Sequence, residues 1–170
     1  MADINLQELF TRIQKGDKDA FVCVYHELKQ PVYTISYRIT QSKETAEDIT
    51  HDVFVKLFSA PPDSSVKNIR AWIFQMTRNL SIDALRKKSR VAEQDKDISD
   101  VDSYDRIHFR MDIETALRKL PRDEREIITL HLNADLNFKE ISQILNLSLT
   151  ATYRKYRKAL NCIQAELNGG

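Results

Sequence analysis

Glycine and proline are scarce in this chain, with three glycines and four prolines among 170 residues. Both residue types interrupt regular helices, and tight turns between strands depend on glycine. Leu, Lys, Glu, Ala, Arg and Gln, which favour helices, are abundant. The sequence therefore predicts long helices joined by few tight turns, and the expected fold class is all-α.

A polar, acidic segment divides the chain. Residues 91–107, VAEQDKDISDVDSYDRI, show no sustained apolar stripe. We expect them to be a linker between two small helical domains, a first unit of residues 1–90 and a second unit of residues 108–170. The second unit is expected to contain four helices, of which the last two form a helix-turn-helix.

Apolar periodicity predicts the helices of the first unit. Residues 17–28 and 32–40 have helical patterns, which Pro31 is expected to separate. In the segment 43–58, KETAEDITHDVFVKLF, apolar residues recur every four positions and predict one buried stripe. The segment 69–88, IRAWIFQMTRNLSIDALRKK, predicts a further helix.

Charges alternate in blocks along the chain, although the formal net charge is only +1. Residues 65–90 contain seven bases and one acid, and residues 91–107 contain six acids and two bases. Residues 149–160 contain four bases and no acid. Two separated basic segments indicate two contacts with phosphate, as expected of a nucleic-acid-binding protein.

The stretch 137–160, NFKEISQILNLSLTATYRKYRKAL, has the pattern of a helix-turn-helix. Asn137 followed by Glu140 fits a capping box at the start of a short helix. Asn146 stands where that helix must end, because asparagine tolerates the left-handed conformation. Ser148 is suited to cap the basic second helix, which can enter the major groove. On this pattern alone, an ordinary helical hairpin with a solvated basic face is the alternative.

The sequence offers little for catalysis, metal binding or membrane insertion. The four histidines form no metal-ligand pair, and there is no glycine-rich phosphate loop. We expect Cys23 and Cys162 to be small packing residues, with Cys23 buried. No apolar run is long enough to span a bilayer, and the N-terminus lacks the pattern of a secretory signal. The expectation is a cytoplasmic protein without cofactor, metal or enzyme activity.

Three motifs, in order, resemble those of the bacterial sigma factors, specifically the small extracytoplasmic-function (ECF) group of the sigma-70 family. ETAEDITHDVFVKLF (44–58) resembles the acidic helix that docks on core RNA polymerase. IRAWIFQMTRNLSIDALRKKSR (69–90) resembles the helix that binds the minus-ten promoter element. The segment 116–160 resembles the reader of the minus-thirty-five element. The resemblance covers the chain from about Glu8 to Leu167, and the short linker replaces the intermediate domain of larger sigma factors.

The resemblance implies an alternative-sigma transcription initiation factor of the bacterial cytoplasm. Such a protein binds core RNA polymerase, directs it to specific promoters and helps open the minus-ten element. The implied partners are core polymerase, promoter DNA and an anti-sigma factor. The DNA would be the double-stranded minus-thirty-five element and the melted minus-ten non-template strand. Residues 1–90 correspond to sigma region 2, and residues 108–170 correspond to sigma region 4.

For polymerase binding, the resemblance implies one face of the helix at 46–58. This acidic face consists of Asp48, His51, Asp52 and Val55. Its two carboxylates can pair with basic groups of a partner, and Val55 can pack between them. Without the resemblance, a solvated acidic surface would be the simpler interpretation.

For the minus-ten element, the resemblance implies a specificity loop at 61–68 that captures a flipped base, followed by a DNA-binding helix. The implied contact residues are Ser64, Ser65, Lys67, Asn68, Gln75, Arg78, Asn79, Arg86, Lys87 and Lys88. Arg78 and the basic triplet 86–88 would bind phosphate. Asn79 is the best candidate for a polar base or backbone contact, with a structural hydrogen bond as the alternative. Trp72 fits core packing better than base stacking.

For the minus-thirty-five element, the implied contacts are Arg125, Lys139, Ala151, Tyr153, Arg154, Arg157 and Lys158. Arg154 or Arg157 could make a two-pronged contact to guanine, whereas Arg125 and Lys139 would touch phosphate. The chain departs from the family pattern at Thr150-Ala151-Thr152, where Gly-Thr-Val is common, and at Tyr153, where a base is usual. His51-Asp52 replaces the usual Gln-Glu pair of the polymerase contact.

A stand-alone helix-turn-helix regulator is the competing function. It would bind promoter DNA without polymerase, often as a dimer on palindromic half-sites. A sigma factor binds DNA poorly without core polymerase and reads two different elements. A protein that has the sigma fold but acts as an antagonist or adaptor is a further alternative.

Overall fold

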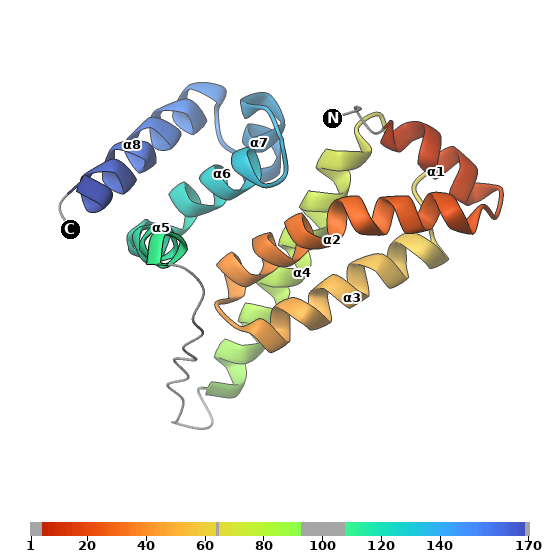
Figure 1. Ribbon diagram of the computed structural model, residues 1–170, viewed down its shortest axis with the longest axis horizontal. Coiled ribbons are helices and arrows are strands. Elements are labelled where there is room, and N and C mark those ends of the chain that lie inside the picture. The colour runs from red at the N-terminus through yellow and green to blue at the C-terminus, as the bar shows by residue number, and fades with distance from the viewer. Residues whose placement is uncertain (1–4, 64, 93–107, 169–170) are drawn as a thin grey trace.

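The computed structural model describes residues 5–63, 65–92 and 108–168, and these ranges contain eight helices and no strand (Figure 1). The all-α prediction is therefore confirmed. The helices are α1 (Leu6–Gln14), α2 (Lys18–Thr40), α3 (Lys43–Ser59), α4 (Ile69–Ala92), α5 (His108–Lys119), α6 (Arg122–Leu132), α7 (Phe138–Leu145) and α8 (Leu149–Asn168). Most of the predicted linker, residues 93–107, lies outside the described residues.

Helix α2 is continuous through Pro31, so the predicted break at this residue is wrong. Proline inside a helix lacks one hydrogen-bond donor and costs ~3 kcal/mol or more. The side chains of Val24, Leu28, Val32 and Ile35 on both sides of it are buried. Each such burial contributes roughly 1.5–3 kcal/mol. Because these contributions together exceed the cost of the proline, the helix continues.

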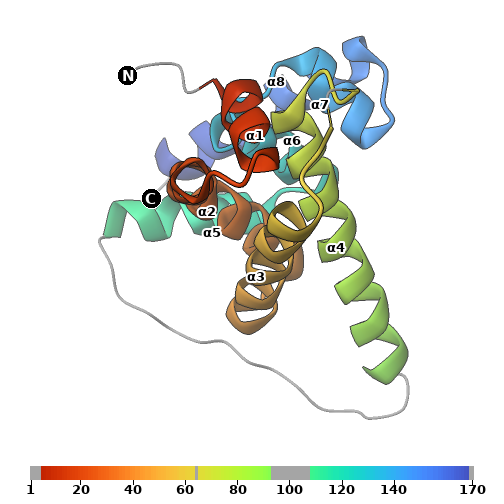
Figure 2. The same cartoon turned by 90° about the vertical axis from the view of Figure 1, so that its right-hand side faces the viewer.

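Helices α2, α3 and α4 pack around one apolar core (Figure 2). Val53 and Leu57 of α3 are fully buried, as their spacing of four residues predicted. Ile73 and Phe74 of α4 are also fully buried, although they point to different sides of their helix. Helix α4 is therefore wedged between neighbouring elements along this part of its length.

The second unit extends the same core. Ile127 and Leu130 of α6 and Ile141 of α7 belong to one hydrophobic cluster with the buried residues of the first unit. The opposite side of α6 contributes Ile128 to a smaller cluster that includes Ala159 of α8. Helix α6 thus lies between α8 and α2 (Figure 1) and buries side chains on both sides.

The local signals predicted for the helix-turn-helix are confirmed. Asn137 Oδ1 accepts the Glu140 N–H at 3.0 Å, and a Glu140 carboxylate oxygen accepts the Asn137 N–H at 2.8 Å. Asn146 ends α7 in the left-handed conformation, with φ 54° and ψ 46°. The Ser148 hydroxyl accepts the N–H of Ala151 at 3.1 Å and caps α8. The capping side chains of Asn137, Glu140 and Ser148, together with the left-handed backbone of Asn146, define the helix starts and the turn between them.

Replacing Asn137 with alanine is expected to lower the free energy of unfolding by about 1 kcal/mol, because one N–H at the start of α7 loses its acceptor. Urea denaturation followed by circular dichroism measures this change. The control is Gln143→Ala on the exposed side of the same helix, with an expected change within about 0.5 kcal/mol. Equal effects of the two substitutions would contradict the capping role.

Both cysteines are exposed, so the expected burial of Cys23 is wrong. In the run FVCVY the fully buried residue is Val24, and Cys23, about 100° away around the helix, faces solvent. Leu160 of α8 is likewise exposed at 39%.

None of the helices in the described residues is long and apolar enough to cross a membrane.

Candidate nucleic-acid interface

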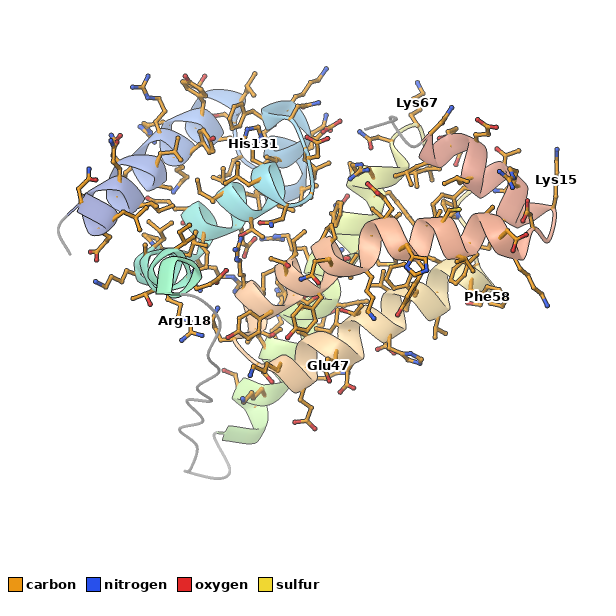
Figure 3. The ribbon with its side chains drawn as sticks, viewed as in Figure 1. Lys15, Glu47, Phe58, Lys67, Arg118 and His131 are labelled. Carbon is orange, nitrogen blue, oxygen red and sulfur yellow. The ribbon has the colours of Figure 1, made fainter. Side chains whose placement is uncertain are left out.

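The four predicted polymerase-binding residues share the solvent side of α3. Asp48, His51 and Asp52 are exposed, and Val55 is 48% exposed. Phe58 follows Val55 by three residues and is 58% exposed at the end of α3 (Figure 3). The acidic face is thus bordered by two accessible apolar side chains. Sequence reasoning missed Phe58, although its helical spacing from Val55 was a usable signal.

A groove between α3 and α4 joins two predicted sites. Asp48 and Asp52 line it from α3, and Arg86, Lys87 and Arg90 line it from α4. The exposed bases lie on the part of α4 that extends beyond the other helices (Figure 2). Predicted polymerase contacts and predicted phosphate contacts therefore border the same surface depression.

A neighbouring groove contains the predicted base-reading residues. Gln75 and Asn79 line it together with Trp72 of the same helix and Lys56 of α3. The Trp72 side chain is half-buried against the core, as predicted, but one part of it borders this groove. Lys56 was absent from the predicted set, because only the packing of α3 on α4 brings it there. The groove combines amides, a cation and an aromatic surface with the carboxylate of Asp83, and its amides and ring suit a nucleobase.

Arg78 lies apart from the other predicted minus-ten residues. Its Nε donates a hydrogen bond to Glu126 of α6 at 2.6 Å. The Glu126 side chain is only 5% exposed and also pairs with Arg122 at 2.8 Å. The structure thus brings Gln75 and Asn79 together and turns Arg78 toward the second unit.

The loop before α4 is held by short-range hydrogen bonds. The Ser65 N–H and hydroxyl both donate to Asp63, and these bonds lower the pKa of the Asp63 carboxyl. Asn68 accepts the N–H of Ala71 at 2.9 Å, and its amide donates to Glu140 of α7 at 2.5 Å. Lys67 is exposed at the start of α4 (Figure 3). Ser64, which was also predicted to contact DNA, lies outside the described residues.

Helix α8 presents a basic surface to solvent. Arg154 and Arg157 are exposed and form no ion pair with any other residue that the structure describes. Tyr153 is 48% exposed, and its ring packs edge-on against Phe138 with centroids 5.5 Å apart. Ala151 is half-buried at the start of the helix. The exposed side of α8 therefore offers two unpaired guanidinium groups beside an aromatic ring.

An aromatic cluster fixes α8 on the rest of the second unit. His131 of α6, labelled in Figure 3, stacks on Phe138 of α7 with centroids 4.7 Å apart. Tyr156 of α8 contacts both rings, at 5.1 Å from His131 and 4.9 Å from Phe138. These contacts set the orientation in which Arg154 and Arg157 face outward.

Two lysines of α8 are already paired within the second unit. Lys158 Nζ bonds the buried Glu124 at 3.0 Å, and this bond raises the pKa of Lys158. Lys155 donates to Asp123 and thereby lowers the pKa of the Asp123 carboxyl. Lys158 was predicted to contact DNA beside Arg154 and Arg157, but in this structure it forms an ion pair with Glu124.

Arg125 also has intramolecular partners. Its guanidinium donates to the carbonyls of Leu117, Arg118 and Leu120 at 2.8, 2.8 and 3.0 Å. It therefore satisfies carbonyls at the end of α5, which would otherwise lack donors. Burial lowers the pKa of Arg125. Its predicted phosphate contact would require a different side-chain arrangement, whereas Lys139 on α7 is exposed.

The fold and these surfaces define a two-part helical DNA-binding protein with a helix-turn-helix in its second part. Family models match both parts: Sigma-70 region 2 matches residues 24–91, and Sigma-70 region 4 matches residues 110–163. The chain belongs to the sigma-70 family, in its ECF group.

Similar proteins include two ECF RNA polymerase sigma factors of Bacillus subtilis (strain 168). SigW is 21% identical over 183 residues, which cover 97% of this chain and 98% of SigW. SigM is 27% identical over 132 residues, which cover 74% of this chain and 81% of SigM. These alignments extend across both predicted units.

Two solved structures share the fold. One is the sigma factor RpoE in complex with the anti-sigma factor NepR from Bartonella quintana, with a TM-score of 0.75, 21% identity and coverage of 89% of this chain and 98% of that chain. The other is CnrH in complex with the cytosolic domain of CnrY, with a TM-score of 0.65 and 21% identity. The match covers 95% of this chain and 96% of CnrH. At this identity the similarity establishes the architecture.

Proposed function

We propose that this chain is an alternative-sigma transcription initiation factor that acts in the bacterial cytoplasm. It binds core RNA polymerase, directs it to specific promoters and helps open the minus-ten element. The observation that carries this proposal is the groove between α3 and α4, where Asp48 and Asp52 face Arg86, Lys87 and Arg90. A protein that couples polymerase docking to strand separation needs these two surfaces side by side.

In this proposal the first unit, residues 1–90, docks on polymerase and recognises the minus-ten element. The acidic face and Phe58 bind a basic and apolar surface of polymerase, since buried apolar anchors and complementary charges dominate such interfaces. Gln75 and Asn79 contact the unpaired non-template strand. Arg86, Lys87 and Lys88 bind its phosphates without reading sequence.

The second unit, residues 108–170, reads the duplex of the minus-thirty-five element. Helix α8 enters the major groove, where Arg154 and Arg157 can bond guanine and Tyr153 can contact a base or the sugar-phosphate backbone. The acidic residues 91–107 join the two readers. RpoE was solved in complex with the anti-sigma factor NepR, and CnrH in complex with the cytosolic domain of CnrY. The RpoE complex supports an anti-sigma factor as a further partner of this chain.

The test is transcription from a library of promoter fragments by bacterial core RNA polymerase, with and without the protein. We expect initiation only when the protein is present, at start sites that share two spaced sequence motifs. Core polymerase alone is the control. Tight binding to a single palindromic DNA site without polymerase, together with no added initiation, would instead support the stand-alone regulator.

A further inference from the structure

Helix α1 lies beside the loop that precedes α4 (Figure 2). Gln14, the last residue of α1, donates a hydrogen bond from Nε2 to the carbonyl oxygen of Pro62 at 2.5 Å. The two residues are 48 positions apart in the sequence. The described part of the loop comprises residues 61–63 and 65–68, and no other hydrogen bond joins it to α1. Gln14 is therefore the polar link between this helix and this loop.

The backbone that carries Gln14 is held in place by packing. Phe10 and Ile13 of α1 are buried in the core. Gln14 follows them by four positions and by one, so it lies at the edge of the buried stripe. Beyond it, the N–H groups of Lys15 and Gly16 donate to carbonyls of the preceding turn and close the helix. Since the end of α1 cannot shift without uncovering Phe10, the amide of Gln14 has a fixed reach.

The loop is stiff where Gln14 holds it. Pro62 is buried, and both prolines of the pair 61–62 have a restricted backbone. Because proline has no N–H, its carbonyl is its one backbone group for hydrogen bonding, and Gln14 supplies the donor to Pro62. Further along, Val66 packs against the core. Losing the donor would leave the carbonyl of a buried residue without a partner, which is unfavourable. The bond thus fixes the loop at its start.

The exposed side of the same loop carries predicted minus-ten contacts. Ser65 and Lys67 are both exposed. The carboxylate of Asp63 accepts the N–H of Ser65 at 2.8 Å, in a turn that starts directly after Pro62. Because this turn is built on the residue that Gln14 holds, a shift of Pro62 would displace both exposed side chains.

We propose that Gln14 is a positioning residue for promoter recognition, whose hydrogen bond to Pro62 holds the loop in the arrangement that discriminates between bases of the melted minus-ten strand. This inference rests on the proposed function and concerns the same DNA-reading surface. Gln14 acts through the loop and does not itself touch DNA. Extruding a base from its stack costs free energy, and a preformed site offsets this cost better than a loop that must first become ordered.

A loosened loop should lose selectivity while it keeps its general attraction to DNA. Discrimination is a difference between the binding free energies of two bases, and it shrinks when the site can adapt to either base. The proposed phosphate contacts of residues 86–88 lie at the other end of α4 and favour every sequence alike. The ratio of affinities for the correct base and for an altered base therefore measures what Gln14 contributes.

Three variants isolate the hydrogen bond. Gln14→Met removes the donor, since methionine has a similar helix preference and cannot donate. Gln7→Met is the matched control, because Gln7 is exposed on the same helix and its side chain forms no hydrogen bond with the other residues that the structure describes. Gln14→Lys restores a donor at the original position. Its added charge favours all DNA sequences alike and cancels in the ratio.

Selectivity is measured with the full chain bound to core polymerase. The probes are promoter fragments with an unpaired minus-ten element, one with the motif found in the promoter library and others with a single altered base. Gln14→Met is expected to lower the ratio of affinities roughly three- to tenfold, the range for the loss of one hydrogen bond. Gln7→Met and Gln14→Lys should keep the ratio within about twofold of that of the unmodified chain. Circular dichroism confirms that every variant keeps its helices.

Amide hydrogen exchange reports the position of the loop directly in the free chain. We expect Gln14→Met to speed exchange at Ser65 and Val66 by roughly three- to tenfold, because their N–H groups donate to Asp63 in the turn beyond Pro62. Exchange in α8 should not change, because this helix packs on α5, α6 and α7. Gln7→Met should leave exchange in the loop unchanged.

The proposal requires both effects of Gln14→Met. Unchanged exchange together with an unchanged ratio of affinities would overturn it. Faster exchange alone would also overturn it, since the loop would then read DNA without this anchor. A lower ratio alone would mean that Gln14 acts by another route, and an equal loss of affinity for every fragment would mean that it does not serve selectivity.

Initiation by core polymerase separates this result from the proposed function. If the unmodified chain directs initiation while Gln14→Met keeps full selectivity, only the positioning role is wrong. If the unmodified chain directs no initiation, the proposed function is wrong and the role of Gln14 in promoter recognition is wrong with it. Hydrogen exchange then still reports whether Gln14 holds the loop.

Discussion

Replacing Asp48 and Asp52 together with lysine is expected to lower the affinity of the chain for core RNA polymerase by at least about 100-fold. The two substitutions turn attraction between the acidic face and a basic partner into repulsion, and like charges across an interface cost several kcal/mol. Both residues are exposed and make no ion pair with the other residues that the structure describes, so the fold should tolerate the change. Binding of labelled chain to core polymerase, followed by fluorescence anisotropy, measures the loss.

The control for this experiment is Glu8→Lys with Asp19→Lys, which changes the net charge equally on another surface. Both residues are exposed, in the first turns of α1 and α2. We expect less than about a fivefold change in polymerase affinity from this pair, as for charges outside a specific interface. A comparable loss in both double variants would mean that net charge, and not the acidic face, determines binding.

The double substitution Arg154→Ala and Arg157→Ala is expected to weaken binding to the minus-thirty-five duplex by about 100-fold or more, since a two-pronged base contact contributes about 1–3 kcal/mol and lost phosphate contacts add to it. Both side chains are exposed and unpaired on α8, so their removal should leave the stability of the second unit nearly unchanged. Electrophoretic mobility shifts at fixed salt, with the duplex identified by the promoter library, provide the measurement.

Lys158→Ala on the same helix is the informative comparison. Lys158 is bound to the buried Glu124, so its removal should reduce duplex affinity less than Arg157→Ala does. It should instead lower the stability of the second unit, because Glu124 is left buried without its partner. A larger effect of Lys158 than of Arg157 on duplex binding would show that the pair with Glu124 opens when DNA binds and that the assignment of contacts on α8 is wrong.

Local features of the fold were predictable because their causes lie within a few residues. The capping box of α7 and the left-handed Asn146 each depend on neighbouring positions and were confirmed. The break at Pro31 was not confirmed, because burial along both halves of α2 outweighs the local preference. The exposure of Cys23 shows a similar limit: an apolar run does not reveal which of its members faces solvent until the helix packs.

In the candidate sites, the sequence predicted which residues share one helix side but not which residues other helices bring beside them. Helical spacing places Gln75 and Asn79 on one side of α4, and the structure brings both to one groove. Helical spacing within α4 does not predict that Lys56 of α3 lines the same groove. The partner of Arg78 lies 48 residues away in the sequence, and that of Lys158 lies 34 residues away. Such partners are set by the packing of helices, which periodicity within one helix does not encode.

The shared core of the two units has a consequence for how the protein is made. Ribosomes complete the first unit before the second, so α2 and α4 fold while Ile127, Leu130 and Ile141 are still missing from their cluster. These side chains follow the end of α4 by about 35 to 50 residues, which corresponds to roughly 2–10 s at translation rates of about 5–20 residues per second. During that interval Arg78 lacks its partner Glu126, and the apolar surface that later packs against the second unit is exposed. The nascent first unit is therefore prone to bind a partner or to aggregate.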